Sequence, residues 1–320
     1  MSKRKMVVNL DLDEKYIDEI KEVAPDWEIA SGKDTDELQE DLKGAEVILN
    51  WKKAIEQTVL EQNNQLKWIQ TWSAGVNNLP LEQLSKRNVS ITSANGVHAY
   101  PISETIFALM LGLTRKIHTY VRQQQQKQWE HADLKLEIHE KTIGVLGVGA
   151  IGLETAKIAK AFGMKVLGVR HSGKSTDYVD EMYTPDQLSD VLPQCDVVVI
   201  TLPLTDETTN LFRKEQFDQM KNSSTLINIG RGPIVKEDEL VEALQSGKIA
   251  GAGLDVFATE PLPEDSPLWD MENVIVTPHT AGSTEHYTER VVRDVFIPNL
   301  KNYLEREKPS KNLVDYDKGY

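Results

Sequence analysis

Hydrophobic residues in this chain gather in short runs rich in Val, Ile and Leu, each ending at Gly, Pro or a polar residue. Runs of this kind are typical of strands that are buried on both faces of a parallel sheet. The first part of the chain predicts strands at 6–10, 27–30, 47–51, 66–69 and 89–92. Later runs predict strands at 142–147, 164–169, 196–200, 225–229, 249–254 and 274–277. Because helical patterns separate the runs, the fold class is α/β.

Two longer segments have helical periodicity instead. From Pro101, apolar residues recur at the spacing of one helix face, which predicts a single helix that ends near the polar tract 123–126. The residues on that face are Ile102, Ile106, Leu109, Met110, Leu113, Ile117 and Val121. A last helix is predicted from about residue 285 to 304.

Four polar residues follow the runs between 225 and 277. Arg231 and Asp255 come directly after two predicted strands, His279 follows the next one, and Glu260 lies in the turn between them. In open α/β sheets, ligands bind at the carboxyl ends of the strands. A guanidinium, a carboxylate and an imidazole gathered there can hold an anionic substrate and move a proton.

A glycine-rich turn joins the predicted strand 142–147 to a helix. Gly147, Gly149 and Gly152 have the spacing of a dinucleotide-binding motif, and the strand before and helix after them supply the required context. Gly147 permits the tight turn, Gly149 lets the pyrophosphate approach the backbone, and Gly152 lets helix and strand pack closely. The first N–H groups of the helix, at Ala150 and Ile151, should face the phosphates.

The segment after the next strand favours one cofactor. Where an NAD-binding chain has an acidic residue for the ribose hydroxyls, this chain has Arg170, His171, Ser172 and Lys174. Cations and a hydroxyl can bind a 2′-phosphate by charge-assisted hydrogen bonds. The sequence therefore predicts NADP(H), with NAD(H) as the alternative.

Composition narrows the remaining classes. The formal net charge of −14 over 320 residues argues against a nucleic-acid partner. The only cysteine, Cys195, excludes an intrachain disulfide, and no long apolar run is present, so we expect a soluble cytoplasmic protein. His286 follows His279 without a Cys cluster or an Asp-rich segment, and we predict no metal.

Four stretches in this order resemble the D-specific 2-hydroxyacid dehydrogenase family: 147–152, 226–235, 253–261 and 278–282. The resemblance covers essentially the whole chain. It implies that Arg231 holds the substrate carboxylate and carbonyl, that His279 is the acid/base, that Glu260 pairs with His279, and that Asp255 contacts the nicotinamide carboxamide.

The resemblance also implies the fold and further site residues. It gives two Rossmann-like or flavodoxin-like, doubly wound parallel-sheet domains with an active-site cleft between them. Residues 1–97 and 285–320 would form the substrate domain, and 98–284 the dinucleotide-binding domain, through which a homodimer is expected. Within the segment 71–77, the backbone around Ala74, Gly75 and Val76 would bind the substrate carboxylate. Further residues assigned to the cofactor are Leu202, Pro203, Thr208, Ile229, Gly230, His279 and Gly282, and His279 is assigned to the substrate as well.

The chemistry can be argued from the residues as well. Reduction of a 2-oxo acid needs a hydride, a proton for the carbonyl oxygen, and a cation for the carboxylate. His279 suits the proton donor because an imidazole titrates near physiological pH, and Arg231 stays charged throughout. Reduction should therefore slow as pH rises through the titration of the imidazole.

The sequence thus predicts an oxidoreductase that reduces a small 2-oxo acid, nearest the glyoxylate and hydroxypyruvate reductases. A formate dehydrogenase is disfavoured, because the resemblance would require Gln in place of Glu260. A phosphite dehydrogenase would add a Lys to the loop in which this chain has Ser73 and Ala74. A nucleotide-sensing corepressor, which would bind cofactor without turnover, stays open as the alternative from a different class.

Overall fold

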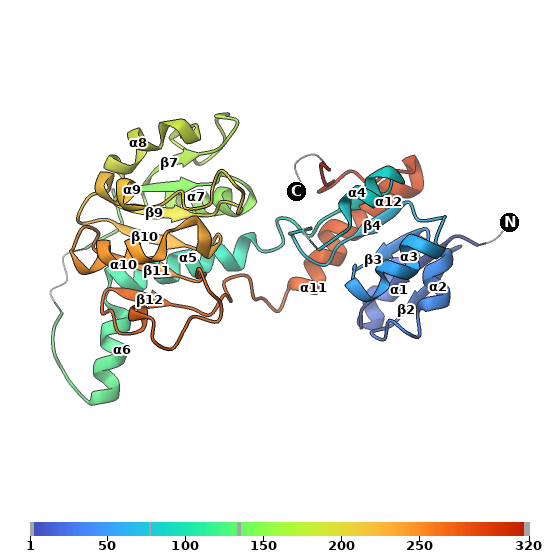
Figure 1. Cartoon of the computed structure of the whole chain (residues 1–320), viewed down its shortest axis with the longest axis horizontal. Coiled ribbons are helices and arrows are strands. Elements are labelled where there is room, and N and C mark those ends of the chain that lie inside the picture. The colour runs from blue at the N-terminus through green and yellow to red at the C-terminus, as the bar shows by residue number, and fades with distance from the viewer. Residues whose placement is uncertain (1–2, 77, 133–135, 317–320) are drawn as a thin grey trace. The chain divides into compact units, whose positions relative to one another are not determined.

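The computed structural model describes residues 3–76, 78–132 and 136–316, and the chain divides into two units. Unit 1 comprises Met1–Val97 and Glu285–Tyr320, and unit 2 comprises His98–Thr284 (Figure 1). Unit 1 is therefore built from both ends of the chain.

The sheet of unit 1 is wholly parallel, with the strand order β2-β1-β3-β4-β5. This is the flavodoxin-like order of a doubly wound sheet. Its strands are β1 (Lys5–Val8), β2 (Glu28–Ser31), β3 (Val47–Leu49), β4 (Trp68–Gln70) and β5 (Ser90–Thr92).

Helices cover both faces of this sheet because successive strand residues point to opposite sides. Val7 and Ile48 pack with Leu42 and Val59, whereas Met6 packs with residues of the chain's last helix. The helices of unit 1 are α1 (Glu14–Val23), α2 (Gln39–Gly44), α3 (Glu56–Gln62), α4 (Leu81–Lys86), α11 (Tyr287–Glu289), the π-helical segment η6 (Arg290–Phe296) and α12 (Ile297–Arg306).

The sheet of unit 2 is also parallel, in the order β12-β11-β10-β9-β6-β7-β8. Counted from β6, this is the Rossmann order extended by one strand, and its topological switch point lies between β6 and β9. Its strands are β6 (Thr142–Leu146), β7 (Lys165–Val169), β8 (Glu181–Tyr183), β9 (Val197–Ile200), β10 (Thr225–Asn228), β11 (Gly251–Leu254) and β12 (Val274–Val276).

Two hydrophobic layers sandwich this second sheet. Val197 and Val199 of β9 face a layer with α5 and α7, whereas Val198 and Ile200 face the layer with α9 and α10. The fold class predicted from the sequence, two doubly wound parallel α/β sheets, is thereby confirmed. The helices of unit 2 are α5 (Ala99–Thr114), α6 (Ile117–Gln126), α7 (Ala150–Ala161), α8 (Leu188–Val191), α9 (Lys214–Gln219) and α10 (Glu237–Gln245).

The single helix predicted from Pro101 is wrong in one respect, because it divides into α5 and α6. Lys116 between them has a φ of 55°, a left-handed conformation that interrupts a right-handed helix. Ile106, Leu109 and Leu113 of α5 are buried, whereas no residue of α6 is. Figure 1 shows α6 extending away from the body of unit 2.

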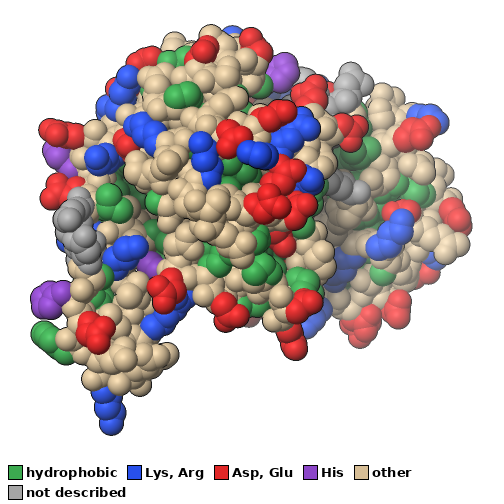
Figure 2. Space-filling model, turned by 60° about the vertical axis from the view of Figure 1, so that its left-hand side comes forward, with side chains coloured by type: hydrophobic (Ala, Val, Ile, Leu, Met, Phe, Trp, Pro, Cys, Tyr) green, Lys and Arg blue, Asp and Glu red, His purple; other side chains and the backbone are tan. Residues whose placement is uncertain are grey.

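The surface is mixed in charge despite the net charge of −14. Figure 2 shows Lys and Arg side chains interspersed with Asp and Glu over the face in view. Within the described ranges, no helix combines the length and apolar character that a bilayer crossing requires.

Candidate active site

Three neighbouring strands of unit 2 bring the predicted catalytic residues together. Asn228 of β10 pairs with Leu254 of β11, and Leu254 pairs with Val276 of β12, so the three strands end level with one another. The segments that carry Arg231, Asp255 and His279 therefore leave the sheet side by side. This is the carboxyl edge at which ligands bind in such sheets.

His279 and Glu260 form a hydrogen-bonded pair. The ring nitrogen Nδ1 of His279 lies 2.7 Å from Oε2 of Glu260. Both side chains stay in contact with solvent, with 49% of His279 and 35% of Glu260 exposed. Because Nδ1 is engaged by the carboxylate, Nε2 is the ring atom left to exchange a proton with a substrate.

Glu260 is held in its ionised form. Desolvation opposes ionisation, but the hydrogen bonds from His279 and from the Phe257 N–H, with the nearby charges of His279 and Arg231, lower the pKa of Glu260 below its usual range. Arg231 thus lies close enough to act on this carboxylate electrostatically. The three predicted catalytic residues form one cluster.

Arg231 projects from a tight turn after β10. The buried Asn228 side chain accepts a hydrogen bond from the Gly230 N–H at 3.1 Å and donates one to the Arg231 carbonyl at 3.2 Å. Gly232 is required next, because a Cβ at that position would overlap the Phe257 carbonyl. The Arg231 side chain itself is exposed, with Nη1 2.6 Å from the Gly230 carbonyl oxygen.

Asp255 is 1% exposed, and its carboxylate holds the loop that carries His279. Oδ1 accepts hydrogen bonds from the Thr277 hydroxyl at 2.5 Å and the Thr280 N–H at 3.0 Å, and Oδ2 accepts one from the Ala281 N–H at 3.0 Å. His279 has a φ of 52°, which is uncommon for a residue with a side chain. The contacts of Asp255 keep the loop in this conformation.

The glycine turn after β6 has the geometry that a dinucleotide needs. Gly147 has a φ of 104°, and a Cβ there would lie 2.9 Å from the Thr201 hydroxyl. A Cβ on Gly152 would overlap the Gly147 carbonyl, whereas one on Gly149 would meet no atom of the described residues within 4 Å. The open space is therefore at Gly149, beside the first N–H groups of α7 at Ala150 and Ile151, where a pyrophosphate fits.

The cationic segment follows β7, as the sequence predicts for the second strand of the motif. The Arg170 N–H donates to the Tyr183 carbonyl of β8 at 3.1 Å, and the chain turns at Gly173, whose φ is 59°. His171, Ser172 and Lys174 are exposed. Among the described residues, no carboxylate forms an ion pair with Arg170 or Lys174, so both charges are available to a ligand.

The remaining residues assigned to the cofactor lie at the same edge of the sheet. Leu202 and Pro203 follow β9, and the Thr208 hydroxyl closes their loop on the Pro203 carbonyl at 2.7 Å. Gly230 packs against the Leu202 carbonyl, directly after the buried Ile229. The Gly282 carbonyl lies 2.9 Å from Nδ1 of His98.

The predicted substrate loop lies in unit 1, directly after β4. Ser73, Ala74 and Gly75 are exposed, and the side chain of Val76 is buried. Among the described residues, the backbone N–H groups of Ala74, Gly75 and Val76 meet no acceptor. The last residue of this predicted segment, Asn77, lies outside the described residues.

Three residues that support the site were not predicted as site residues. Asn228 and Thr277 hold the turns of Arg231 and His279, and the Thr201 hydroxyl donates to the Gly147 carbonyl at 2.6 Å. Each is a polar residue at or just past the end of a buried apolar strand. That position was the available signal, because a polar group there needs a hydrogen-bond partner.

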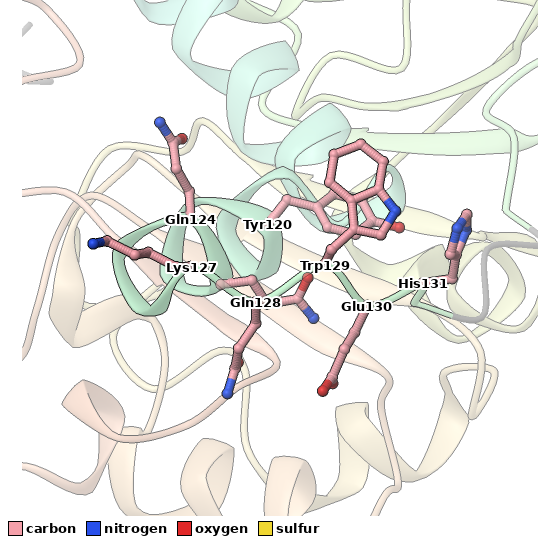
Figure 3. Close-up of a pocket in the computed structure, with 8 residues that line it drawn as sticks. Tyr120, Gln124, Lys127, Gln128, Trp129, Glu130 and His131 are labelled. Carbon is pink, nitrogen blue, oxygen red and sulfur yellow. The ribbon is translucent and has the colours of Figure 1, made fainter.

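A separate hollow lies on α6 and the segment after it. Figure 3 shows Tyr120, Gln124 and Trp129 among the side chains around it. None of the predicted catalytic residues lines it. Within the described part of the chain, no group of His, Cys, Asp and Glu side chains could hold a metal ion.

The doubly wound sheet with a glycine turn at its switch point defines a dinucleotide-binding protein, and comparison with known proteins gives its family. Residues 107–281 match the model of the NAD binding domain of the D-isomer specific 2-hydroxyacid dehydrogenases. The chain belongs to this family and is an oxidoreductase.

Its relatives cover nearly the whole chain. It is 37% identical over 272 residues to glyoxylate/hydroxypyruvate reductase B of Serratia proteamaculans, covering 83% of each chain. A family member from Aeromonas salmonicida has a solved structure that superposes with a TM-score of 0.84 at 32% identity, covering 99% of this chain and 100% of that one. The NADPH-dependent glyoxylate/hydroxypyruvate reductase of Sinorhizobium meliloti, solved with NADP and sulfate, has a TM-score of 0.78 at 28% identity, with 99% and 100% covered.

Proposed function

We propose that this protein reduces a small 2-oxo acid to the D-2-hydroxy acid with NADPH. The observation that carries the proposal is the His279–Glu260 pair, 2.7 Å apart, beside Arg231 at the carboxyl edge of a dinucleotide-binding sheet. An acid/base, the carboxylate that stabilises its charged form and a permanent cation are the groups that carbonyl reduction requires.

Each residue has a defined part in the reaction. A dihydronicotinamide bound at the glycine turn would supply the hydride that the carbonyl carbon accepts. As the C=O π bond opens, Nε2 of His279 gives its proton to the oxygen, and Glu260 stabilises the imidazolium beforehand. Arg231 binds the substrate carboxylate and stabilises negative charge that develops on the oxygen, which favours the transition state. The N–H groups of Gly75 and Val76 are assigned to the carboxylate as well.

For the substrate we propose a short 2-oxo acid such as glyoxylate or hydroxypyruvate. The support is that the Serratia and Sinorhizobium relatives are reductases of these compounds. Neither name fixes the size of the side-chain pocket in this protein, and longer 2-oxo acids therefore belong in the same assay.

For the cofactor we propose a preference for NADPH over NADH. Arg170 stands where a carboxylate would serve NAD, and the neighbouring His171, Ser172 and Lys174 are exposed donors. A 2′-phosphate would form charge-assisted hydrogen bonds with this segment. The Sinorhizobium relative is NADPH-dependent, which supports the same assignment.

The test is a set of initial rates with NADPH and NADH on glyoxylate, hydroxypyruvate, pyruvate and 2-oxoisocaproate. Arg170→Asp should reverse the cofactor preference, because an aspartate repels a 2′-phosphate and accepts from ribose hydroxyls. Lys301→Asp, the same charge reversal at an exposed site of unit 1, should leave it unchanged. Binding of cofactor without turnover of any 2-oxo acid would replace the proposal with the sensor hypothesis.

We further infer a homodimer that forms through α6 and the residues after it. Ile117, Val121 and Trp129 are 54%, 49% and 93% exposed, which is a high apolar exposure for one short segment. A second copy related by a two-fold axis would cover the same residues on both chains. Light scattering should give twice the chain mass for the wild type and the chain mass for Val121→Glu. A monomeric wild type at micromolar concentration would contradict this inference.

A further inference from the structure

Three carbonyl groups of the loop 72–76 of unit 1 accept hydrogen bonds. The Ser73 carbonyl accepts from the Thr71 hydroxyl at 2.6 Å and from the Ala94 N–H at 3.0 Å. The Gly75 carbonyl accepts from the Ser73 hydroxyl at 2.7 Å. The Trp72 carbonyl accepts from the hydroxyl of Tyr287.

These bonds also orient the N–H groups. In a trans peptide, the C=O and the following N–H lie in one plane and point in opposite directions. The bonds to the carbonyls of Trp72, Ser73 and Gly75 therefore fix the direction of the next N–H groups along the chain, which are those of Ser73, Ala74 and Val76. The result is a run of donors without protein acceptors among the described residues, which is an arrangement that binds anions.

One of the three anchors comes from a distant part of the sequence. The Trp72 carbonyl is held by Tyr287, 215 residues further along the chain and at the start of α11. The two aromatic rings pack edge to face, with centroids 6.0 Å apart, beside the buried Ala94 and Val291. Burial raises the pKa of Tyr287 to about 12, so its hydroxyl remains a donor at any working pH.

We propose that Tyr287 is a positioning residue for substrate: its hydroxyl fixes the first peptide of the 72–76 loop, so that the loop's N–H groups are already oriented to receive a carboxylate. The inference rests on the proposed function, since it assigns a task to the loop that binds the substrate carboxylate. Tyr287 acts through the loop and takes no part in the proton or hydride transfer.

The test is Tyr287→Phe, which keeps the ring contact with Trp72 and removes only the hydroxyl. Tyr316→Phe is the matched control, because the Tyr316 hydroxyl, also in unit 1, donates to the Val89 carbonyl at 2.5 Å and to no carbonyl of the loop 72–76. For each protein we would measure KM and kcat for glyoxylate, KM for NADPH, the melting temperature, and calorimetric binding of oxamate in the presence of NADPH.

Tyr287→Phe should raise KM for glyoxylate and Kd for oxamate by about fivefold to tenfold, as expected for one lost hydrogen bond. Its kcat and its KM for NADPH should stay within about twofold of the wild type, and Tyr316→Phe should match the wild type in all four kinetic and binding constants. Equal KM and Kd in Tyr287→Phe and the wild type would overturn the inference. A fall in kcat and melting temperature with unchanged KM and Kd would also overturn it, because this shows a structural role only.

Oxamate binding separates this inference from the proposed function. If the wild type reduces no 2-oxo acid but binds oxamate, and Tyr287→Phe weakens that binding, the proposed function is wrong and the role of Tyr287 stands. If the wild type reduces glyoxylate but Tyr287→Phe binds oxamate as tightly as the wild type, the proposed function stands and the role of Tyr287 is wrong. A wild type that neither reduces 2-oxo acids nor binds oxamate would refute both.

Discussion

At the scale of single residues, the chemistry depends on a glutamate with both oxygens occupied. Oε1 of Glu260 accepts from the Phe257 N–H at 3.0 Å, and Oε2 engages His279 at 2.7 Å. An ionised carboxylate can only accept, so the His279 ring must present its Nδ1 proton to it. This leaves Nε2 as the proton donor to substrate.

The pH dependence of reduction should follow from this pair. Because the pKa of Glu260 is lowered, the carboxylate stays ionised to lower pH than an ordinary glutamate, and the rate should hold to correspondingly lower pH. In Glu260→Gln the rate should fall, because a neutral amide no longer stabilises the imidazolium that donates the proton.

The measurement is kcat/KM for glyoxylate from acid to alkaline pH in the wild type and Glu260→Gln. His279→Asn should lower the rate by about 10²-fold to 10⁴-fold at all pH values. Equal kcat/KM for the wild type and Glu260→Gln would rule out this role for the pair.

At the scale of elements, two glycines of the βα turn after β6 have different roles. Gly149 leaves space for the cofactor, and Gly152 lets the helix pack against the turn. Gly149→Ala should fold with an unchanged melting temperature but bind NADPH much more weakly, because its Cβ meets no atom of the described residues within 4 Å and fills the space assigned to the pyrophosphate. Gly152→Ala should lower the melting temperature, because its Cβ overlaps the Gly147 carbonyl. Thermal melts with and without NADPH measure both. Unimpaired NADPH binding by Gly149→Ala would place the cofactor elsewhere.

The loop from Thr277 to Ala281 gives a second prediction at this scale. In Asp255→Asn, the side-chain NH₂ would replace an oxygen that now accepts hydrogen bonds, and would face a donor instead. We expect a loss of about 2 kcal/mol in unfolding free energy and a lower kcat, since the His279 loop loses its anchor. Thr277→Val removes one of the three bonds and should cost about 1 kcal/mol. Denaturant titration and kcat measure both variants, and a stable, fully active Asp255→Asn would contradict this view of the loop.

Elements with a strong local signal could be predicted from the sequence, and elements fixed by distant contacts could not. Strands such as β9 and β10 are recognisable because all their residues are buried and polar residues occur only at the two ends of β10. Strand β8 was not predicted, because Glu181–Tyr183 is short, polar and only partly buried, and pairs with β7 alone. The break between α5 and α6 at Lys116 was not predicted either, because the apolar residues Ile117 and Val121 continue the spacing of α5.

The candidate site divides in the same way. That Arg231, Glu260 and His279 lie together could be predicted, because they stand at the ends of readable strands or in the turn between them; their catalytic roles stay a proposal. That Asp255 holds the His279 loop, or that Tyr287 holds Trp72, depends on contacts between residues far apart in sequence. No local pattern specifies such contacts, and only the folded sheet brings the partners together.

At the scale of the whole molecule, unit 1 must join the two ends of the chain. Arg4, Glu46 and Tyr303 form the cluster that does so: the Arg4 guanidinium contacts Glu46 at 2.5 Å, and the Tyr303 hydroxyl donates to Glu46 at 2.7 Å. Arg4 also lies over the ring of Trp27, 4.4 Å from its centroid. The cluster ties the start of the chain to α12, so that β1 and the last helix share one core.

Glu46 makes this link between the two ends of the chain sensitive to acid. Desolvation opposes its ionisation, but hydrogen bonds from Arg4 and Tyr303 outweigh it and lower the pKa of Glu46. A lowered pKa in the folded state means that the unfolded chain binds the proton more readily. The stabilisation of the folded state by ionised Glu46 is therefore complete above the pKa of a glutamate in the unfolded chain. It is lost as pH falls through the pKa of Glu46 in the folded state.

Glu46→Gln should thus destabilise the protein at neutral pH by about 1–2 kcal/mol, and the difference from the wild type should shrink as pH falls below about 4. Glu61→Gln is the control, because Glu61 is exposed and, among the described residues, accepts only from Gln57, at 3.3 Å. Melting temperatures of the three proteins between neutral and acid pH measure the effect. A difference between Glu46→Gln and the wild type that is constant with pH would mean that the charge of Glu46 contributes nothing, and that the cluster joins the chain ends by packing alone.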